Sequence, residues 1–302
     1  MAFNIWRFTD DKSGHDSQST ALCTAIEKLK SSERFDIPVD SFLDSLKHLL
    51  FKQFPQGKDL PDPDIIIGAG HGTHFPMLSA RHARKGKIIV LMKPSLPLSF
   101  FDYCIIPKHD LSPENENVIA TAGALNPVQF NENNASTLGL ILLGGPSRHY
   151  QWDSKSIINQ IVTIVTTNSH IRWAIADSPR TPTDTLTTIS ELGLENIGVL
   201  RHDKTDMKQV HDLIFKAKNV WVSMDSISMI YESLSSGASV GLLEIPQKQK
   251  NRISNSINIL INENRLTSFS TWKNTNVLAA NTIKFNEAAR CAKLLLERGA
   301  LN

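Results

Sequence analysis

The stretch Val222-Ser-Met-Asp-Ser-Ile-Ser-Met-Ile-Tyr-Glu-Ser-Leu-Ser-Ser-Gly-Ala-Ser-Val240 decides the fold class of this chain. The apolar run that leads into it ends in Ser223, Asp225 and Ser226, residue types that favour turns and helix starts. Gly237 is typical of a helix end. The segment therefore predicts a strand, a polar turn, a short helix and a second strand, which is the β-α-β unit of parallel sheets.

The predicted helix also has features of a nucleotide site. The backbone N–H groups of its first turn have no partner within the helix, and together with the helix dipole they attract phosphate. Glu232 follows Ser226 by almost two turns and lies near the same face, about 10 Å along the axis at ~1.5 Å per residue. Its carboxylate could reach a ribose while the amides hold a pyrophosphate. The alternative is an ordinary β-α-β unit with a solvated glutamate.

Composition limits the class of protein. The chain has 302 residues, of which 41% are hydrophobic and 21% charged, and this is typical of a globular protein with two domains. The formal net charge of +2 gives no electrostatic reason to expect nucleic acid. The three cysteines are far apart, so we expect neither a disulfide framework nor a zinc site, and a reducing cytoplasm fits them. We expect neither an export signal nor a membrane span.

Apolar strands alternate with amphipathic helices along most of the chain, as in parallel α/β folds. Strands are predicted at 3–8, 64–67, 87–92, 103–106, 117–121, 138–143, 172–176, 197–200 and 219–222, and helices at 18–30, 39–52, 75–84, 153–167, 183–192, 207–217 and 286–298. Turn-forming residues at 123–136 predict a linker. The pattern predicts two Rossmann-like, doubly wound domains that face a cleft, with functional loops at the carboxyl ends of the strands.

Polar loops follow two strands of the second predicted domain. Gly144 and Gly145 would let backbone approach a ligand, and Ser147 could donate to phosphate oxygens. Arg180 follows the next strand and is a natural cation for a diphosphate, although a solvated loop arginine is the ordinary alternative. Together with Ser226 and Glu232, these residues indicate a phosphate-binding edge.

The first predicted domain offers a candidate base. His15 lies in a polar loop at 9–18 after the first strand, and it is the side chain there that titrates near neutrality. A surface histidine is the alternative. A second loop, Gly68-Ala-Gly-His-Gly-Thr-His74, could form an anion nest, but its glycine spacing is not a dinucleotide fingerprint. We expect its two histidines to form hydrogen bonds rather than bind metal.

Five motifs in this order resemble the family named after the plant mitochondrial-fission (elongated mitochondria) factor and its bacterial relatives. They are Ser13-Gly-His-Asp-Ser-Gln18, Phe101-Asp-Tyr-Cys-Ile-Ile-Pro-Lys-His-Asp110, Asn117-Val-Ile-Ala-Thr-Ala-Gly-Ala-Leu-Asn126, Leu143-Gly-Gly-Pro146 and Asp225-Ser-Ile-Ser-Met-Ile-Tyr-Glu232. The segment from Asp225 to Val240 is also similar to the donor-site helix of GT-B glycosyltransferases. In those enzymes a glutamate matching Glu232 holds the nucleotide ribose.

The resemblance implies a GT-B fold. Residues 1–130 would form an acceptor-side domain, 137–275 a nucleotide-sugar domain, and 276–302 a terminal helix that packs back on the first domain. The implied activity is transfer of a sugar from a nucleotide-activated donor to a lipooligosaccharide-like acceptor of the cell envelope. The protein would be cytoplasmic and peripheral to the inner membrane, where it would meet a lipid-linked acceptor, and 93–101 is a candidate apolar and basic rim.

The predicted site follows from these roles. His15 or Asp16 would act as the acceptor base. The nucleotide sugar, a co-substrate, would be held by Gly144, Gly145, Ser147, Arg180, Asp225, Ser226 and Glu232, with no obligatory metal or other cofactor.

Two other functions stay open: a catalytically inert GT-B scaffold that binds a protein partner, as the plant namesake implies, and a nucleotide-sugar 2-epimerase. One departure from the family pattern is His71, which stands where an arginine is common.

Overall fold

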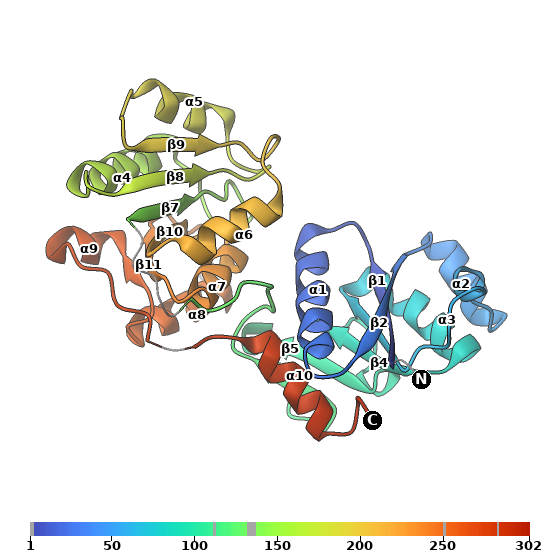
Figure 1. Ribbon diagram of the computed structural model, residues 1–302. Coiled ribbons are helices and arrows are strands. Elements are labelled where there is room, and N and C mark those ends of the chain that lie inside the picture. The colour runs from blue at the N-terminus through green and yellow to red at the C-terminus, as the bar shows by residue number, and fades with distance from the viewer. Residues whose placement is uncertain (1–2, 111–112, 132–136, 250–251, 283) are drawn as a thin grey trace. The chain divides into compact units, whose positions relative to one another are not determined.

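The computed structural model describes residues 3–110, 113–131, 137–249, 252–282 and 284–302. The chain divides into two compact units: Met1–Pro127 with Asn286–Asn302 is unit 1, and Val128–Phe285 is unit 2. Residues 132–136 of the predicted linker lie outside the described part. Each unit contains a six-stranded sheet (Figure 1). None of the described helices is long and apolar enough to cross a bilayer.

Unit 1 is built on a parallel sheet with the order β2-β1-β3-β4-β5-β6. Its strands are β1 (Phe3–Thr9), β2 (Ser32–Pro38), β3 (Ile65–Ala69), β4 (Lys87–Leu91), β5 (Tyr103–Pro107) and β6 (Val118–Thr121). Its helices are α1 (Ser13–Glu27), α2 (Phe42–Leu50), α3 (His74–Arg84) and α10 (Glu287–Glu297), with single 3-10 turns at Pro55–Gly57, His71–Thr73, Leu98–Phe100 and Lys108–Asp110. The strands β3 and β4 are buried nearly throughout, as in a sheet covered on both faces.

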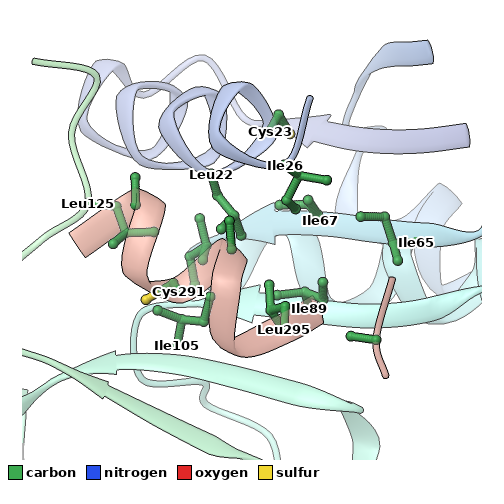
Figure 2. Packing of buried hydrophobic residues seen from close by; sticks show 14 of the residues in the cluster. Leu22, Cys23, Ile26, Ile65, Ile67, Ile89, Ile105, Leu125, Cys291 and Leu295 are labelled. Atoms are coloured by element: carbon green, nitrogen blue, oxygen red, sulfur yellow. The ribbon is translucent and has the colours of Figure 1, made fainter. Parts of the chain in front are cut away.

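The last helix, α10, packs on the sheet of unit 1 although it follows all of unit 2 in the chain. Figure 2 shows Cys291 and Leu295 of α10 among side chains of α1 and the central strands, including Leu22, Ile67 and Ile89. These five side chains are fully buried. Apolar residues at helical spacing thus give α10 the buried stripe that its sequence predicts.

Unit 2 is built on a second parallel sheet, with the order β12-β11-β10-β7-β8-β9. Its strands are β7 (Leu138–Leu142), β8 (Arg172–Ala176), β9 (Ile197–Leu200), β10 (Asn219–Ser223), β11 (Ser239–Leu243) and β12 (Thr267–Ser268). Its helices are α4 (Ser154–Thr167), α5 (Thr183–Glu191), α6 (Met207–Lys216), α7 (Ile227–Ser235), α8 (Arg252–Asn262) and α9 (Phe269–Thr275). The prediction of two Rossmann-like sheets is confirmed.

Both sheets have a point at which the direction of chain progression reverses. In unit 1 the reversal lies between β1 and β3, because α1 leads to β2 on one side and α3 leads to β4 on the other. In unit 2 it lies between β7 and β10, from which α4 and α7 lead in opposite directions. The loops at the carboxyl ends of such strands are where open α/β sheets bind ligands.

The structure corrects several boundaries predicted from sequence. The edge strand β2 was not predicted because, within Ser32–Pro38, only Ile37 is fully buried and no apolar run marks it. The helix α1 starts at Ser13 rather than 18, so His15 lies in its first turn and not in a loop. No side chain caps this start, which removes the usual sequence signal. Helices α8 and α9 and the two-residue strand β12 were also not predicted.

Candidate functional site

The candidate site in unit 2 lies at the switch point between β7 and β10. Hydrogen bonds there connect the loop that follows β7 to the loop that follows β10. The amide of Gly144 donates to Ser223 Oγ at 2.7 Å, and the amide of Gly145 donates to Asp225 Oδ2 at 2.9 Å. The Ser223 hydroxyl in turn donates to Asp225 Oδ1 at 2.8 Å. The two loops, about 80 residues apart in sequence, therefore form one framework.

Asp225 is the centre of this framework. Its side chain is fully buried, and Arg180 pairs with it at 2.9 Å while 45% of the arginine side chain stays exposed. The second terminal nitrogen of Arg180 donates to the carbonyls of Gly145 and Pro146. Burying the Asp225 carboxylate without partners would cost several kcal/mol. The ion pair with Arg180 and the hydrogen bond from the Gly145 amide offset that cost. Arg180 keeps an exposed face that an anion could approach.

The packing of the two loops requires both glycines. A Cβ on Gly144 would lie 2.2 Å from the Asp225 carboxylate, and one on Gly145 would lie 2.1 Å from the Arg180 carbonyl oxygen. Both amides already donate to unit 2 itself. The glycines let the two loops approach each other closely, and their predicted role toward a phosphate stays a prediction.

Ser147 stabilises the turn that follows. Its hydroxyl oxygen accepts from the amides of His149 and Tyr150 at 3.2 and 3.1 Å. The neighbouring Tyr150 is buried, and its hydroxyl has no hydrogen-bond partner among the described residues. Burial, and then the negative charge of Asp225, raise the pKa of Tyr150 to about 12. A neutral phenol donor thus lies close to the Asp225 framework.

The helix α7 follows β10 and begins as predicted, with Ser226 at the N-cap position. The Ser226 side chain makes no capping hydrogen bond, so the first-turn amides receive no acceptor from their own N-cap residue. Gly237 follows the helix at φ +85°, and a Cβ there would lie 2.8 Å from the Phe130 ring. The uncapped start of α7 is an electropositive edge next to Asp225 and Arg180.

Glu232 lies on the second turn of α7 and is 8% exposed. Burial raises the pKa of its carboxyl to about 7. Among the described residues, His211 of α6 approaches it, with Nε2 at 4.0 Å from Glu232 Oε1, too far for a hydrogen bond. Burial also lowers the pKa of His211. Burial thus disfavours the charged form of both groups, and the alternative of a solvated glutamate is wrong.

Sequence reasoning missed several partners at this edge. The hydroxyls of Ser178 and Thr181, from the loop after β8, donate to carbonyls of the Leu143–Gly144 loop. Asp177 and His202, which follow β8 and β9, pair through Oδ2 and Nδ1 at 2.9 Å. The sequence shows these polar residues directly after predicted strands, and that position was the available signal. Their hydrogen-bond partners cannot be predicted from sequence because they lie in loops that follow other strands.

Unit 1 carries a histidine–carboxylate couple at its own switch point. His15 Nδ1 lies 2.9 Å from Asp10 Oδ2, and the Asp10 side chain is only 6% exposed. Burial acts to raise the pKa of Asp10, but the hydrogen bond and charge of His15, with Lys12, outweigh it and lower the pKa. Gly70, at φ +79°, leaves room for the ring, since a Cβ there would lie 2.2 Å from His15. Asp10 was not among the predicted site residues.

Asp16 has a different environment from His15 although it is the next residue. Its carboxylate pairs with Arg7 at 2.5 Å, and Arg7 also holds Asp36 at 2.6 Å. Burial acts to lower the pKa of Arg7, but the two aspartates outweigh it and raise the pKa. Asp16 thus contributes to a β1–α1–β2 ion-pair network, and the geometry favours His15 over Asp16 as a base.

The glycine-rich loop after β3 contributes one buried histidine. His74 is 1% exposed, and its Nδ1 lies 3.3 Å from the Ser95 hydroxyl. Burial, with the charge of His71, lowers the pKa of His74 to about 4. His71 is exposed. Within the described part of the chain, no group of three histidine, cysteine or acidic side chains is arranged to hold a metal ion.

Solved structures with the same fold include nucleotide-sugar enzymes. UDP-GlcNAc 2-epimerase from Methanocaldococcus jannaschii aligns with a TM-score of 0.62 and 13% identity, over 98% of this chain and 100% of that chain. The epimerase from Neisseria meningitidis, bound to UDP-GlcNAc, aligns with a TM-score of 0.58 and 11% identity over 100% of both chains. MurG from Acinetobacter baumannii aligns at 0.53 and 11%, over 98% and 99%. The fold is of the GT-B type.

Sequence comparison gives the family. The uncharacterized protein RP120 of Rickettsia prowazekii (strain Madrid E) is 24% identical in an alignment 290 residues long, and the match covers 78% of this chain and 81% of that protein. The family described as mitochondrial fission ELM1 matches residues 13–299, nearly the whole chain. The resemblance carried by the five sequence motifs is therefore confirmed, and the chain belongs to the mitochondrial fission ELM1 family.

Proposed function

We propose that this protein is a glycosyltransferase that moves a sugar from a nucleotide-activated donor to a glycan acceptor of the cell envelope. The observation that carries the proposal is the Asp10–His15 couple. A protein that only bound a nucleotide or a partner would not require a histidine oriented by a buried carboxylate. The same arrangement orients bases in enzymes that deprotonate hydroxyl groups.

The donor half of the reaction belongs to unit 2. The uncapped start of α7 at Ser226 and the exposed face of Arg180 are suited to the diphosphate, while the Asp225, Gly144 and Gly145 framework holds both in position. Glu232 is suited to accept hydrogen bonds from ribose hydroxyls. The positive end of α7 and the arginine would stabilise the leaving diphosphate without an obligatory metal.

The acceptor half belongs to His15. When the Nδ1–H group of His15 donates a hydrogen bond to Asp10, the Nε2 lone pair is free to take a proton from an acceptor hydroxyl. The acceptor oxygen then forms a bond to the anomeric carbon while the bond from that carbon to the diphosphate breaks. The electron pair leaves with the nucleoside diphosphate, and the proton stays on His15.

The proposed acceptor is a lipooligosaccharide-like, lipid-linked glycan at the cytoplasmic surface of the inner membrane. The rim proposed at 93–101 is only partly exposed: Phe101 is buried, Leu96 and Leu98 pack against the core of unit 1, and Phe100 is 44% exposed. That segment alone therefore offers little apolar surface to a membrane.

Calorimetry with UDP, GDP and CMP tests the donor half. Replacing Glu232 by alanine should weaken binding of the preferred nucleotide by about 10- to 150-fold, or roughly 1.5 to 3 kcal/mol, if ribose bonds to the carboxylate. Glu191→Ala, at an exposed glutamate of α5, is the matched control and should bind normally. Equal affinity in both variants would exclude Glu232 from the site.

Product analysis separates the enzyme classes. The protein is incubated with a panel of UDP-, GDP- and CMP-sugars, with and without a lipooligosaccharide fraction, and sugars are followed by NMR. Transfer that requires the acceptor supports the proposal. Interconversion of the donor without acceptor would indicate an epimerase, and absence of both reactions would favour an inert scaffold.

A further inference from the structure

The helix α2 and Phe51, the residue after it, expose four large apolar side chains, while Leu46 and Leu49 of the helix are half-buried and Ser45 is buried. Phe42, Leu43, Leu50 and Phe51 are 63%, 75%, 73% and 65% exposed, and they are four of the five large hydrophobic side chains in the described part of the chain that exceed 60%. Within α2 the buried residue is Ser45. A soluble surface helix normally shows the reverse pattern.

The position of α2 is fixed by polar contacts, by Leu49, which packs against the core of unit 1, and by Phe42, whose ring meets Phe75 of α3 edge to face with 5.4 Å between the ring centroids. Ser41 caps the helix by accepting from the Asp44 amide at 3.2 Å, and His48 pairs with Asp40 at 3.4 Å. Ser79 of α3 donates to the Ser45 carbonyl at 3.2 Å, and α2 packs beside α3 (Figure 1). These contacts hold the helix against α3 with Leu43, Leu50 and Phe51 outward.

Charged side chains indicate what kind of surface covers this face. Leu43 and Leu50 are two turns apart on one face, and Lys47, one turn after Leu43, lies beside them. Lys47 and Lys52 are exposed, and the acidic group of the helix, Asp44, accepts from the Ser41 hydroxyl at 2.6 Å. An apolar protein partner would bury the Lys47 ammonium without a counter-charge, which is costly. A lipid interface instead lets the lysine stem lie flat with its charge among anionic headgroups.

We propose that the face formed by Phe42, Leu43, Lys47, Leu50, Phe51 and Lys52 docks on an anionic lipid bilayer. Phenylalanine and leucine side chains would insert at the boundary of headgroups and acyl chains, and the two lysines would remain at the headgroups. The inference deepens the proposed function, because it supplies the surface at which a lipid-linked acceptor is met. Membrane docking needs no sugar transfer, so it is measured separately.

Vesicle flotation of the full chain tests the apolar part. The protein is mixed with vesicles of phosphatidylcholine alone or of phosphatidylcholine and phosphatidylglycerol in equal parts. Wild-type protein should float with the anionic vesicles. Leu43→Ser combined with Leu50→Ser should reduce the partition coefficient at least tenfold. Ile259→Ser with Val277→Ser removes two other exposed apolar side chains and should float like wild type.

A second variant tests the charges while leaving the apolar residues in place. Lys47→Gln with Lys52→Gln should weaken flotation on anionic vesicles by about fivefold for each lysine, and added salt should weaken wild-type binding in the same direction. These exposed positions should leave thermal unfolding unchanged, which circular dichroism checks.

Two results would overturn the proposal. One is wild-type protein that stays in solution with both kinds of vesicle. The other is a dimer in light scattering that Leu43→Ser with Leu50→Ser dissociates, since a second copy of the chain would then cover the face. A loss of flotation with intact donor binding and transfer to a soluble acceptor would leave the proposed enzyme standing.

Discussion

Glu232→Gln should make the protein more stable at alkaline pH. The Glu232 carboxyl is buried, and burial raises its pKa from 4.5 to about 7. In the unfolded chain the carboxyl has its ordinary pKa, so between these two values the folded state binds the proton more tightly. The free energy of unfolding therefore falls as pH rises from about 4.5 to about 7 and then stays low.

The size of the effect follows from the shift. Each pKa unit corresponds to about 1.4 kcal/mol, so a rise from 4.5 to about 7 corresponds to about 3 kcal/mol. Glutamine has nearly the same shape and carries no charge. The variant should therefore exceed wild type by up to about 3 kcal/mol above pH 7, and the difference should vanish near pH 4.5. For a unit of this size that is roughly 6 to 12 °C in melting temperature.

Thermal unfolding followed by circular dichroism across this pH range measures the difference. Glu191→Gln, at an exposed glutamate in the same unit, should melt with wild type at every pH. Parallel melting curves for Glu232→Gln and wild type from acidic to alkaline pH would refute the reasoning, because a buried carboxyl with a raised pKa must produce a pH-dependent gap. Glu232→Gln should also bind nucleotide more weakly than wild type. Glu232 would then lower the stability of the protein while it strengthens nucleotide binding.

Three further substitutions follow from the two switch points. His15→Ala should lower sugar transfer by roughly 10²- to 10⁴-fold while donor affinity in calorimetry stays unchanged, with His82→Ala on α3 as the exposed control; weakened donor binding would contradict the assignment of His15 to the acceptor. Gly70→Ala should destabilise the protein by about 1 kcal/mol or more, because φ is +79° and the new methyl group meets the His15 ring, and transfer should fall with it. Asp225→Ala leaves the Gly145 amide without its acceptor, and we expect it to lower the free energy of unfolding by about 1 to 3 kcal/mol. Denaturant titration measures this change, and a midpoint equal to that of wild type would show that water replaces the lost acceptor.

The sequence by itself determined the fold class and the places of the polar loops that follow β7, β8 and β10. Strand and helix periodicity are local properties, so β-α-β units such as the one from Asn219 to Leu243 could be read from single segments. The start of α7 at Ser226, its end before Gly237 and the place of Glu232 on its second turn all follow from residues within one short stretch. The family could be identified because its motifs are also local.

The tertiary structure alone decided the chemistry of these residues. Asp225 meets an amide about 80 residues away, and only strand order brings the two loops together. Asp10 faces His15 because α1 begins at Ser13, a start without a side-chain cap that propensity does not mark. The solvation of Glu232 and the outward turn of the α2 apolar face depend on which neighbours cover each helix. Burial and partner choice arise from packing between distant segments, so local pattern cannot specify them.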